Sequence, residues 1–277
     1  MGQVVERAKK MRTTTARTAA KPLGNVTRGT TNPNRLRRVD RWIAGPQAWR
    51  LRTAAEPLVV DLGYGATPTT AVELYRRLAK VHPGVELAGI EIEPERVARG
   101  LEMATGKLHF LLGGFEIPTA RRPVIVRAFN VLRQYEAADV PGIWATICAR
   151  LTESGLLVEG TCDEIGRRAS WVAVAKSGPV SLTVSQRFGS FDRPSDVAER
   201  LPKALIHRNV PGERVHRFLA GLDQAWLDHA ALASFGPRQR WTAACRSLKA
   251  DGWPVLDGVD RWRLGELTVA WSAVSPD

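Results

Sequence analysis

Cysteine and histidine are scarce in this sequence, and their spacing excludes several kinds of site. The cysteines Cys148, Cys162 and Cys245 lie far apart and form no CxxC pair, which argues against a zinc site or a disulfide framework and predicts buried thiols. The five histidines have no metal-binding spacing, so we expect no metal site. We also expect neither His82 nor His109 to be catalytic.

Long apolar runs are absent as well. No stretch approaches the roughly 18 consecutive apolar residues of a membrane-spanning helix, and the first residues lack the apolar block of a secretory signal. We therefore expect a cytoplasmic protein with no integral membrane segment. With 277 residues and 44% hydrophobic content, the chain can bury a substantial core, and one large domain or one domain with an appendage is predicted.

Acidic residues are rare near the N-terminus. Residues 1–56 contain 13 Lys and Arg residues and three acidic ones, whereas the rest of the chain has 27 against 25. This distribution predicts a basic, disordered arm over residues 1–30, followed by a nearly neutral domain. Residues 1–52 could attract RNA or another polyanion, or the arm could simply keep the chain soluble.

A short amphipathic helix is predicted within residues 31–55. Apolar and basic residues recur there at helical spacing, namely Leu36, Val39, Trp42 and Ile43 among Arg35, Arg37, Arg38 and Arg41. Such a helix either packs against the domain or covers a pocket. In the second case, Arg37, Arg38 and Trp42 would contact a substrate.

From residue 56 onward, strand and helix patterns alternate. The predicted strands are residues 58–61, 85–90, 108–112, 123–132 and 155–162, and the predicted helices are residues 69–80, 94–103 and 140–151. Strands separated by helices of this length indicate an α/β fold with a doubly wound, mostly parallel, Rossmann-like sheet and helices on both faces. Ligands of such sheets bind beyond the carboxyl ends of the strands.

A glycine turn follows the first predicted strand in the stretch VVDLGYGATP, residues 59–68. Gly63 and Gly65 would let a ligand approach the backbone, and the next helix would point its amide groups to the same place. Dinucleotide enzymes have a third glycine where this chain has Pro68, which brings no N–H group for a phosphate. A pyrophosphate ligand is therefore disfavoured, and an NAD-dependent oxidoreductase stays a distant alternative.

Two acidic residues at strand ends favour another ligand. Asp61 ends the first strand, where its carboxylate would repel a phosphate and attract an amine or a sulfonium. Glu91 ends the second strand, where it can accept hydrogen bonds from both hydroxyls of a ribose. A nucleoside attached to a cation describes S-adenosylmethionine. Each residue alone also fits a structural role, the glycines in a tight turn and Glu91 as a helix cap.

Five segments in order resemble the class I S-adenosylmethionine-dependent methyltransferases over residues 58–161. They are VVDLGYG, GIEIEPE, FLLGGFEIP, FNVLRQY and LTESGLLVEG. The resemblance implies that the methionine part is held by Asp61, Gly63 and Gly65, the ribose by Glu91, the adenine by Gly114 and Phe115, and the amino-acid end by Asn130. Gly114 stands where the family often has an acid, so that contact would come from the backbone of Phe115 or from Glu116.

The methyl acceptor is less clearly indicated. There is no Asn-Pro-Pro-aromatic sequence after the fourth strand and no cysteine on a suitable loop. Position alone places Asn130, Tyr135 and Glu159 near the transferred methyl group as candidate catalytic residues, where Tyr135 or Glu159 would accept a proton. Arg133 would hold an anionic substrate. Packing or surface roles for these residues remain open.

Residues 163–277 have a different pattern from the cofactor-binding core expected at residues 56–162. A β-hairpin is predicted at residues 167–188, helices at residues 195–207, 213–233 and 237–250, and a terminal strand or hairpin at residues 261–274. We expect these parts to complete the sheet and the substrate side of a domain that spans residues 56–277. Six tryptophans would either line an aromatic pocket or pack in the core: Trp171, Trp226, Trp241, Trp253, Trp262 and Trp271.

These observations together favour an S-adenosylmethionine-dependent methyltransferase that acts on a small molecule or on RNA. The alternative of another class is a non-catalytic nucleic-acid-binding protein that retains the methyltransferase fold.

Overall fold

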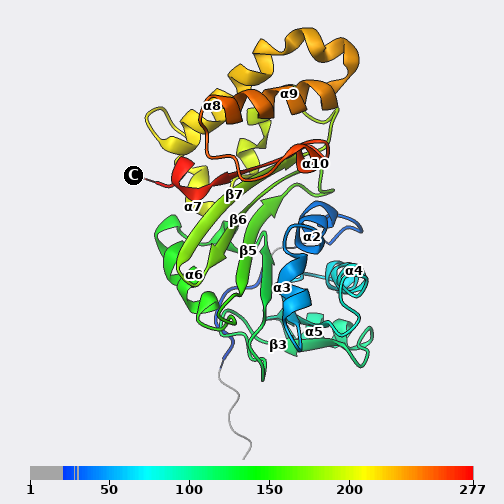
Figure 1. The fold of residues 1–277 in the computed structure, drawn as a ribbon. Helices are drawn as coiled ribbons and strands as arrows, with labels where there is room; N and C mark the ends of the chain where they lie inside the picture. The colour runs from blue at the N-terminus through cyan, green and yellow to red at the C-terminus, as the bar shows by residue number, and fades with distance from the viewer. Residues whose placement is uncertain (1–20, 28, 30, 277) are drawn as a thin grey trace, which may run out of the picture.

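An eight-stranded β-sheet forms the centre of the molecule, with helices on both faces (Figure 1). The computed structural model describes residues 21–27, residue 29 and residues 31–276. The strand order is β3-β2-β1-β4-β5-β6-β7-β8, in which β1 to β5 are parallel and β6 to β8 are antiparallel to their neighbours. The strands are β1 (Leu58–Leu62), β2 (Glu86–Glu91), β3 (Leu108–Leu112), β4 (Ile125–Phe129), β5 (Leu156–Cys162), β6 (Arg168–Ala175), β7 (Gly178–Gln186) and β8 (Glu266–Ala270).

Two layers of helices bury the sheet. Because β1, β4 and β5 are buried along their whole length, both faces have to be covered, as is usual for parallel strands. One face packs against α2 (Arg37–Ala44), α3 (Ala48–Thr53), α4 (Thr69–Leu78) and α5 (Pro94–Leu101). The opposite face packs against α6 (Val140–Cys148), α7 (Lys203–Ile206), α8 (Arg214–Asp228), α9 (Pro237–Ala250) and α10 (Val259–Trp262).

The predicted Rossmann-like sheet is confirmed over β1 to β5. The order β3-β2-β1-β4-β5 reverses between β1 and β4, and ligands of doubly wound sheets bind beyond the carboxyl ends of the strands at this point. The hairpin predicted at residues 167–188 is confirmed as β6 and β7, and the predicted terminal strand is β8. The chain passes from β5 to β6 without a helix.

Two of the predicted helices are each divided into two shorter elements. The helix expected at residues 195–207 is divided into η3 (Pro194–Arg200) and α7, because Pro202 has no N–H group to continue the first helix. The helix expected at residues 213–233 is α8 followed by η4 (Ala230–Phe235). Further 3-10 turns are η1 (Leu132–Gln134), η2 (Ala137–Asp139) and η5 (Trp271–Ala273).

Most of the six tryptophans, for which either an aromatic pocket or a core position was expected, lie in the core. Trp171 and Trp241 are fully buried, and Trp226 and Trp262 are nearly so. All three cysteines are buried, as predicted. In the described part of the chain no helix is both long and apolar enough to cross a membrane, and no cluster of three potential metal ligands occurs there.

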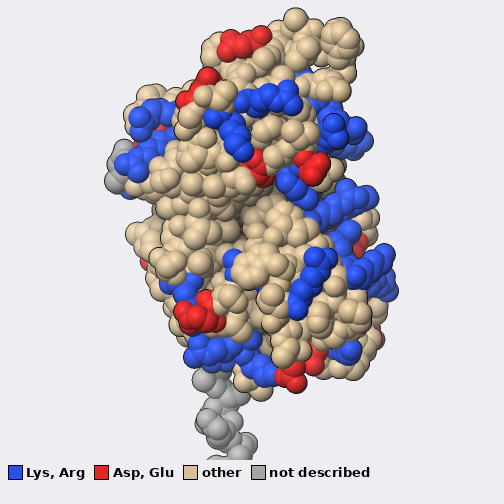
Figure 2. All heavy atoms as spheres, in the orientation of Figure 1, with Lys and Arg blue, Asp and Glu red and all other residues tan. Residues whose placement is uncertain are grey.

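On the face shown in Figure 2, Lys and Arg side chains cover more of the surface than Asp and Glu side chains do. Most of the predicted basic arm over residues 1–30 lies outside the described residues. Of residues 1–30, the structure describes residues 21–27 and Gly29, and the described chain continues from Thr31. We call residues 21–27, Gly29 and Thr31 the leading segment, and it lies against the carboxyl ends of the parallel strands.

Candidate functional site

The glycine turn after β1 and the acidic end of β2 meet directly. Gly63 and Gly65 have φ values of +68° and +89°, a conformation that glycine adopts without strain. The Gly65 N–H group donates to Oε2 of Glu91 over 2.9 Å, and Glu91 is 1% exposed. An added Cβ at Gly63 would lie 2.8 Å from Cγ2 of Val131. The turn therefore requires glycine, and a hydrogen bond holds it against the carboxylate of Glu91.

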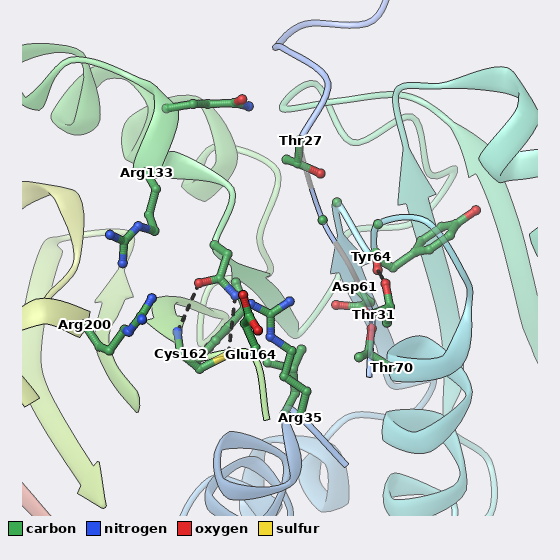
Figure 3. Close-up of a pocket in the computed structure, with 17 residues that line it drawn as sticks. Thr27, Thr31, Arg35, Asp61, Tyr64, Thr70, Arg133, Cys162, Glu164 and Arg200 are labelled. Atoms are coloured by element: carbon green, nitrogen blue, oxygen red, sulfur yellow. Dashed lines mark hydrogen bonds between the residues drawn. The ribbon is translucent and has the colours of Figure 1, made fainter. Parts of the chain in front are cut away.

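A cleft of about 510 Å³ opens beside this turn. We call it the turn cleft. Figure 3 shows Asp61, Tyr64 and Thr31 on one side of it and Arg133 and Arg200 on the other, with Arg35 between them. The backbone of the leading segment also contributes to its wall, since Gly29 accepts a hydrogen bond from Ala66 N–H at 3.2 Å.

The wall opposite the glycine turn is cationic. Burial, followed by the charge of Arg200, lowers the pKa of Arg133. The side chain of Arg133 donates to the backbone oxygen of Glu199 over 3.3 Å. Glu164 and Asp61 are the carboxylates among the described residues that line the cleft. The local charge therefore favours a ligand or substrate with a negative group.

Asp61 is neutralised within the protein. Arg127 on β4 donates to Asp61 through Nε to Oδ1 over 2.9 Å and through Nη2 to Oδ2 over 2.6 Å. Its Nη1 pairs with Asp40 on α2, and all three side chains are at most 3% exposed. We expected Asp61 to attract a cationic ligand; instead Arg127 supplies the positive charge.

This buried cluster changes the ionisation of its members. Burial raises the pKa of Asp40 to about 6, although the Arg127 and Arg77 guanidinium groups oppose that shift. Burial alone would lower the pKa of Arg127, but Asp61 and Asp40 raise it above its ordinary value. Arg127 also donates to the backbone oxygen of Thr70 at the start of α4 over 3.0 Å. The cluster therefore ties β1, β4, α2 and α4 together beneath the turn.

Asn130 is at the end of β4 and lines the turn cleft. Its φ of +59° is unusual for a residue with a side chain. Its amide donates to Sγ of Cys162 over 3.3 Å and accepts from the Cys162 N–H group over 3.1 Å. The side chain thus bridges the carboxyl ends of β4 and β5. Burial raises the pKa of Cys162, so its thiol stays protonated near neutral pH.

The leading segment occupies the place where the adenine was expected. The Phe115 N–H group donates to the backbone oxygen of Leu23 over 2.9 Å, and the Leu23 N–H group donates to Oε2 of Glu116 over 2.9 Å. A Cβ on Gly114 would lie only 1.9 Å from the Leu23 oxygen. The backbone N–H and C=O groups of one residue, Leu23, therefore occupy the Glu116 carboxylate and the Phe115 amide, the groups that the resemblance assigned to the adenine.

The same segment continues across the neighbouring loops. Asn25 N–H donates to Oη of Tyr135 over 2.6 Å, and Arg96 donates to the backbone oxygen of Thr27 over 2.9 Å. A cavity of about 20 Å³ remains between the segment and Glu91, Gly114 and neighbouring residues. That volume holds about one water molecule, whereas ligand pockets measure roughly 300–1,000 Å³.

The other predicted site residues are scattered. Tyr135 lies on the side of the leading segment rather than in the turn cleft. Glu159 on β5 is fully buried, and the structure does not bring it to the turn cleft. Trp42 is 4% exposed and packs edge-on against Trp171, with ring centroids 5.8 Å apart.

Arg37 and Arg38 also lie elsewhere, because they line a second cleft on the outer side of α2. Of the predicted catalytic and substrate residues, the turn cleft therefore brings together Asn130 and Arg133, and it adds Arg35 and Arg200.

The sequence itself marks two of these residues as unusual. Arg127 is a charge inside an otherwise apolar strand, and Asp40 lies on the apolar side of the amphipathic helix. Buried charges of this kind are usually paired, so a buried partner of opposite charge could have been expected for each. Arg200 had no such signal, since it belongs to an ordinary polar stretch.

Comparisons with known proteins find partial likenesses only. No protein-family model matches this chain, and no curated protein matches it. Among solved structures, the plantazolicin methyltransferase BamL is 13% identical, with 47% of this chain and 46% of that chain covered and a TM-score of 0.36. Mitomycin 7-O-methyltransferase MmcR is 20% identical, with 45% and 36% covered and a TM-score of 0.33.

A third solved structure is human N-acetylserotonin methyltransferase, which is 19% identical, with 46% of this chain and 37% of that chain covered and a TM-score of 0.31. The matched part of this chain thus spans less than half of the length of each of these proteins.

Proposed function

We propose that the protein is an S-adenosylmethionine-dependent methyltransferase. The observation that carries this proposal is the contact between the Gly63–Gly65 turn and Glu91 at the reversal of strand order. The turn lets a ligand approach the backbone, and the carboxylate of Glu91 retains lone pairs for the hydroxyls of a ribose. The turn cleft adjoins this point and provides space for an acceptor.

The residues present fit the cofactor once the leading segment has moved. Glu91 would hold the ribose, the backbone at Phe115 with Glu116 the adenine edge, and the turn with Asn130 the methionine end. The cofactor supplies an electrophilic methyl group on a sulfonium. With Leu23 in its observed position, the adenosine end has about 20 Å³ of free volume, so we infer that cofactor binding requires displacement of the leading segment.

The acceptor is proposed to carry a negative charge. Arg133 and Arg200 lie on the cleft wall opposite the glycine turn, and Arg35 lies between the two walls. Guanidinium groups bind carboxylates and phosphates through paired hydrogen bonds. Asp61 is committed to Arg127, so Glu164 is the remaining carboxylate of this cleft that could accept a proton. Methyl transfer depends mainly on alignment of the reacting atoms, so few catalytic groups are needed.

Equilibrium binding of S-adenosylhomocysteine tests this proposal. The wild-type protein should bind it, and NAD should not compete. Glu91→Gln removes one charge and should weaken binding by roughly tenfold to a hundredfold, because hydrogen bonds to charged groups contribute about 1.5–3 kcal/mol.

Glu95→Gln on the exposed side of α5 is the matched control and should leave the affinity unchanged. Equal effects of the two variants, or displacement by NAD, would contradict the proposal.

A second candidate function is nucleic-acid binding without catalysis. The observation that favours it is the position of the leading segment. The segment occupies the adenosine end of the proposed cofactor site, where the backbone of Leu23 forms hydrogen bonds with Phe115 and Glu116. On this hypothesis the segment never leaves. A folded protein that binds single-stranded RNA but no S-adenosylhomocysteine, even after the leading segment is destabilised, would support this candidate.

A further inference from the structure

A second cleft, of about 420 Å³, lies on the outer side of α2. Five arginines from three parts of the chain line it: Arg37, Arg38 and Arg41 on α2, Arg167 before β6, and Arg187 after β7. We call it the arginine cleft. The Arg187 N–H group donates to the backbone oxygen of Arg167 over 2.7 Å, which fixes these two residues side by side. The cleft is therefore built on the sheet and α2 rather than on a loose loop.

Among the described residues, those that line the arginine cleft carry more positive than negative charge. Glu266 is the carboxylate that lines it, and Glu266 is paired with Arg261 through Nε and Nη2. In the described part of the chain, none of the five lining arginines forms an ion pair with an acidic side chain. Figure 2 shows Lys and Arg side chains gathered on the right-hand side, at the height where Figure 1 shows α2.

Arg38 shows the energetic consequence of this arrangement. Its Nη1 donates to Ser185 Oγ and to the backbone oxygen of Leu264, each over 3.0 Å. Burial lowers its pKa, and the neighbouring Arg41 and Arg187 lower it further, against the opposite effect of Glu266. Guanidinium groups held this close repel one another, and a bound anion would relieve that repulsion.

The two cationic clefts are neighbours. Between them lies a junction of two chain segments, which two hydrogen bonds hold together. The Arg35 Nε–H group donates to the backbone oxygen of Asp163 over 3.0 Å, and the Asn32 side chain donates to the backbone oxygen of Glu164 over 2.9 Å. Gly166 lies against the backbone of Arg35, so closely that an added Cβ would be 2.0 Å from the Arg35 oxygen. On the far side of this junction, Arg133 and Arg200 line the turn cleft.

We propose that the arginine cleft binds the phosphodiester backbone of a nucleic-acid strand. Planar guanidinium groups match phosphate oxygens in pairs, and a series of arginines from several elements suits a series of phosphates better than one small anion. The neighbouring position of the turn cleft would allow the strand to reach it. Binding in the arginine cleft does not depend on methyl transfer, so the two proposals can fail separately.

The test is binding of a fluorescently labelled single-stranded RNA of 20 nucleotides, and of DNA of the same sequence, to the full chain. The variant is Arg37→Glu with Arg167→Glu, two exposed cleft residues. The matched control is Arg217→Glu with Arg246→Glu, exposed residues of α8 and α9. Both double variants change the net charge equally and keep the basic N-terminus.

The cleft variant should weaken binding by about tenfold or more, and the slope of log affinity against log salt should fall by about 1.4, from two contacts at about 0.7 each. The control should change the affinity by less than about threefold. Equal loss in both variants, or no loss in either, would overturn the proposal. Pyrophosphate that binds in the cleft while neither strand does would also overturn it, in favour of a small phosphorylated ligand.

Discussion

Arg127 and Asp61 form a buried, two-point ion pair between adjacent strands, with Nε–Oδ1 and Nη2–Oδ2 distances of 2.9 and 2.6 Å. The pair lies directly beneath the glycine turn. It removes the free negative charge from the cleft floor, so ligand charge is governed instead by Arg133 and Arg200. A structural ion pair thus alters the balance of charge in the cleft.

The first prediction concerns this pair. Arg127→Leu would leave Asp61 buried without its counter-charge and Asp40 with Arg77 alone, at 3.7 Å, and it should reduce the free energy of unfolding by about 3–5 kcal/mol. Urea unfolding measures the change. Arg217→Leu, on the exposed side of α8, should cost less than about 0.5 kcal/mol. Similar losses in the two variants would show that the buried pair is not a stabilising unit.

The second prediction concerns pH. Burial raises the pKa of Glu159 from its ordinary value of 4.5 to about 8, an effect that the Trp144 indole partly opposes. The folded state therefore favours the protonated carboxyl. The contribution of this protonated group to the free energy of unfolding is complete below pH 4.5 and is lost as the pH rises through about 8. Glu159→Gln mimics the protonated form.

At pH 7.5, Glu159→Gln should be more stable than the wild type by roughly 4 kcal/mol, since one pKa unit corresponds to about 1.36 kcal/mol. The difference should disappear near pH 4. Unfolding by urea at both pH values, with Glu95→Gln as the exposed control, measures it. A difference that does not depend on pH would contradict the assignment.

The third prediction concerns the leading segment. Gly24 has a φ of +131°, and an added Cβ would lie 3.1 Å from the Tyr135 hydroxyl. Gly24→Val should therefore weaken docking of the segment, and the Phe115 amide, which donates to Leu23, should exchange its hydrogen faster. Leu23→Ala changes an exposed side chain and keeps the backbone contacts, so it should leave that rate unchanged. Equal rates in all three proteins would mean that Leu23 does not protect Phe115.

The fourth prediction separates the backbone of Asn130 from its side chain. Asn130→Gly keeps the φ of +59° without strain but loses both hydrogen bonds to Cys162. Asn130→Ala loses the same bonds and adds the cost of a left-handed conformation. The alanine variant should therefore be less stable by about 1–2 kcal/mol than the glycine variant. Thermal unfolding of the two variants checks this order, and the reverse order would contradict it.

The sequence predicted the parallel half of the fold well, for a physical reason. Each of β1 to β5 is a short, mostly apolar run, and the helices between them have their own periodicity, so local patterns determine the elements and their order. The pairing of Asp40 with Arg127, 87 residues apart, depends on how α2 lies over β4, which no local pattern contains. The two charges were visible, but not their contact.

The leading segment was less predictable still. Its stretch KPLGNVTRGTT has few apolar residues, and several of its contacts with the site are made by backbone groups, as in Leu23 with Phe115 and Gly29 with Ala66. Backbone hydrogen bonds leave no side-chain pattern to recognise. The glycines at positions 24 and 114 hinted only that something lies close to them.

The most direct test of the account is equilibrium binding of S-adenosylhomocysteine to three folded proteins: the wild type, Gly24→Val, and Gly24→Val combined with Gly63→Val. If the leading segment covers a cofactor site, Gly24→Val should bind about tenfold more tightly than the wild type, because a larger fraction of the protein is open. The added Gly63→Val should abolish binding, because its Cβ would meet Val131. Absence of binding in Gly24→Val, with its fold intact, would contradict the proposed cofactor site.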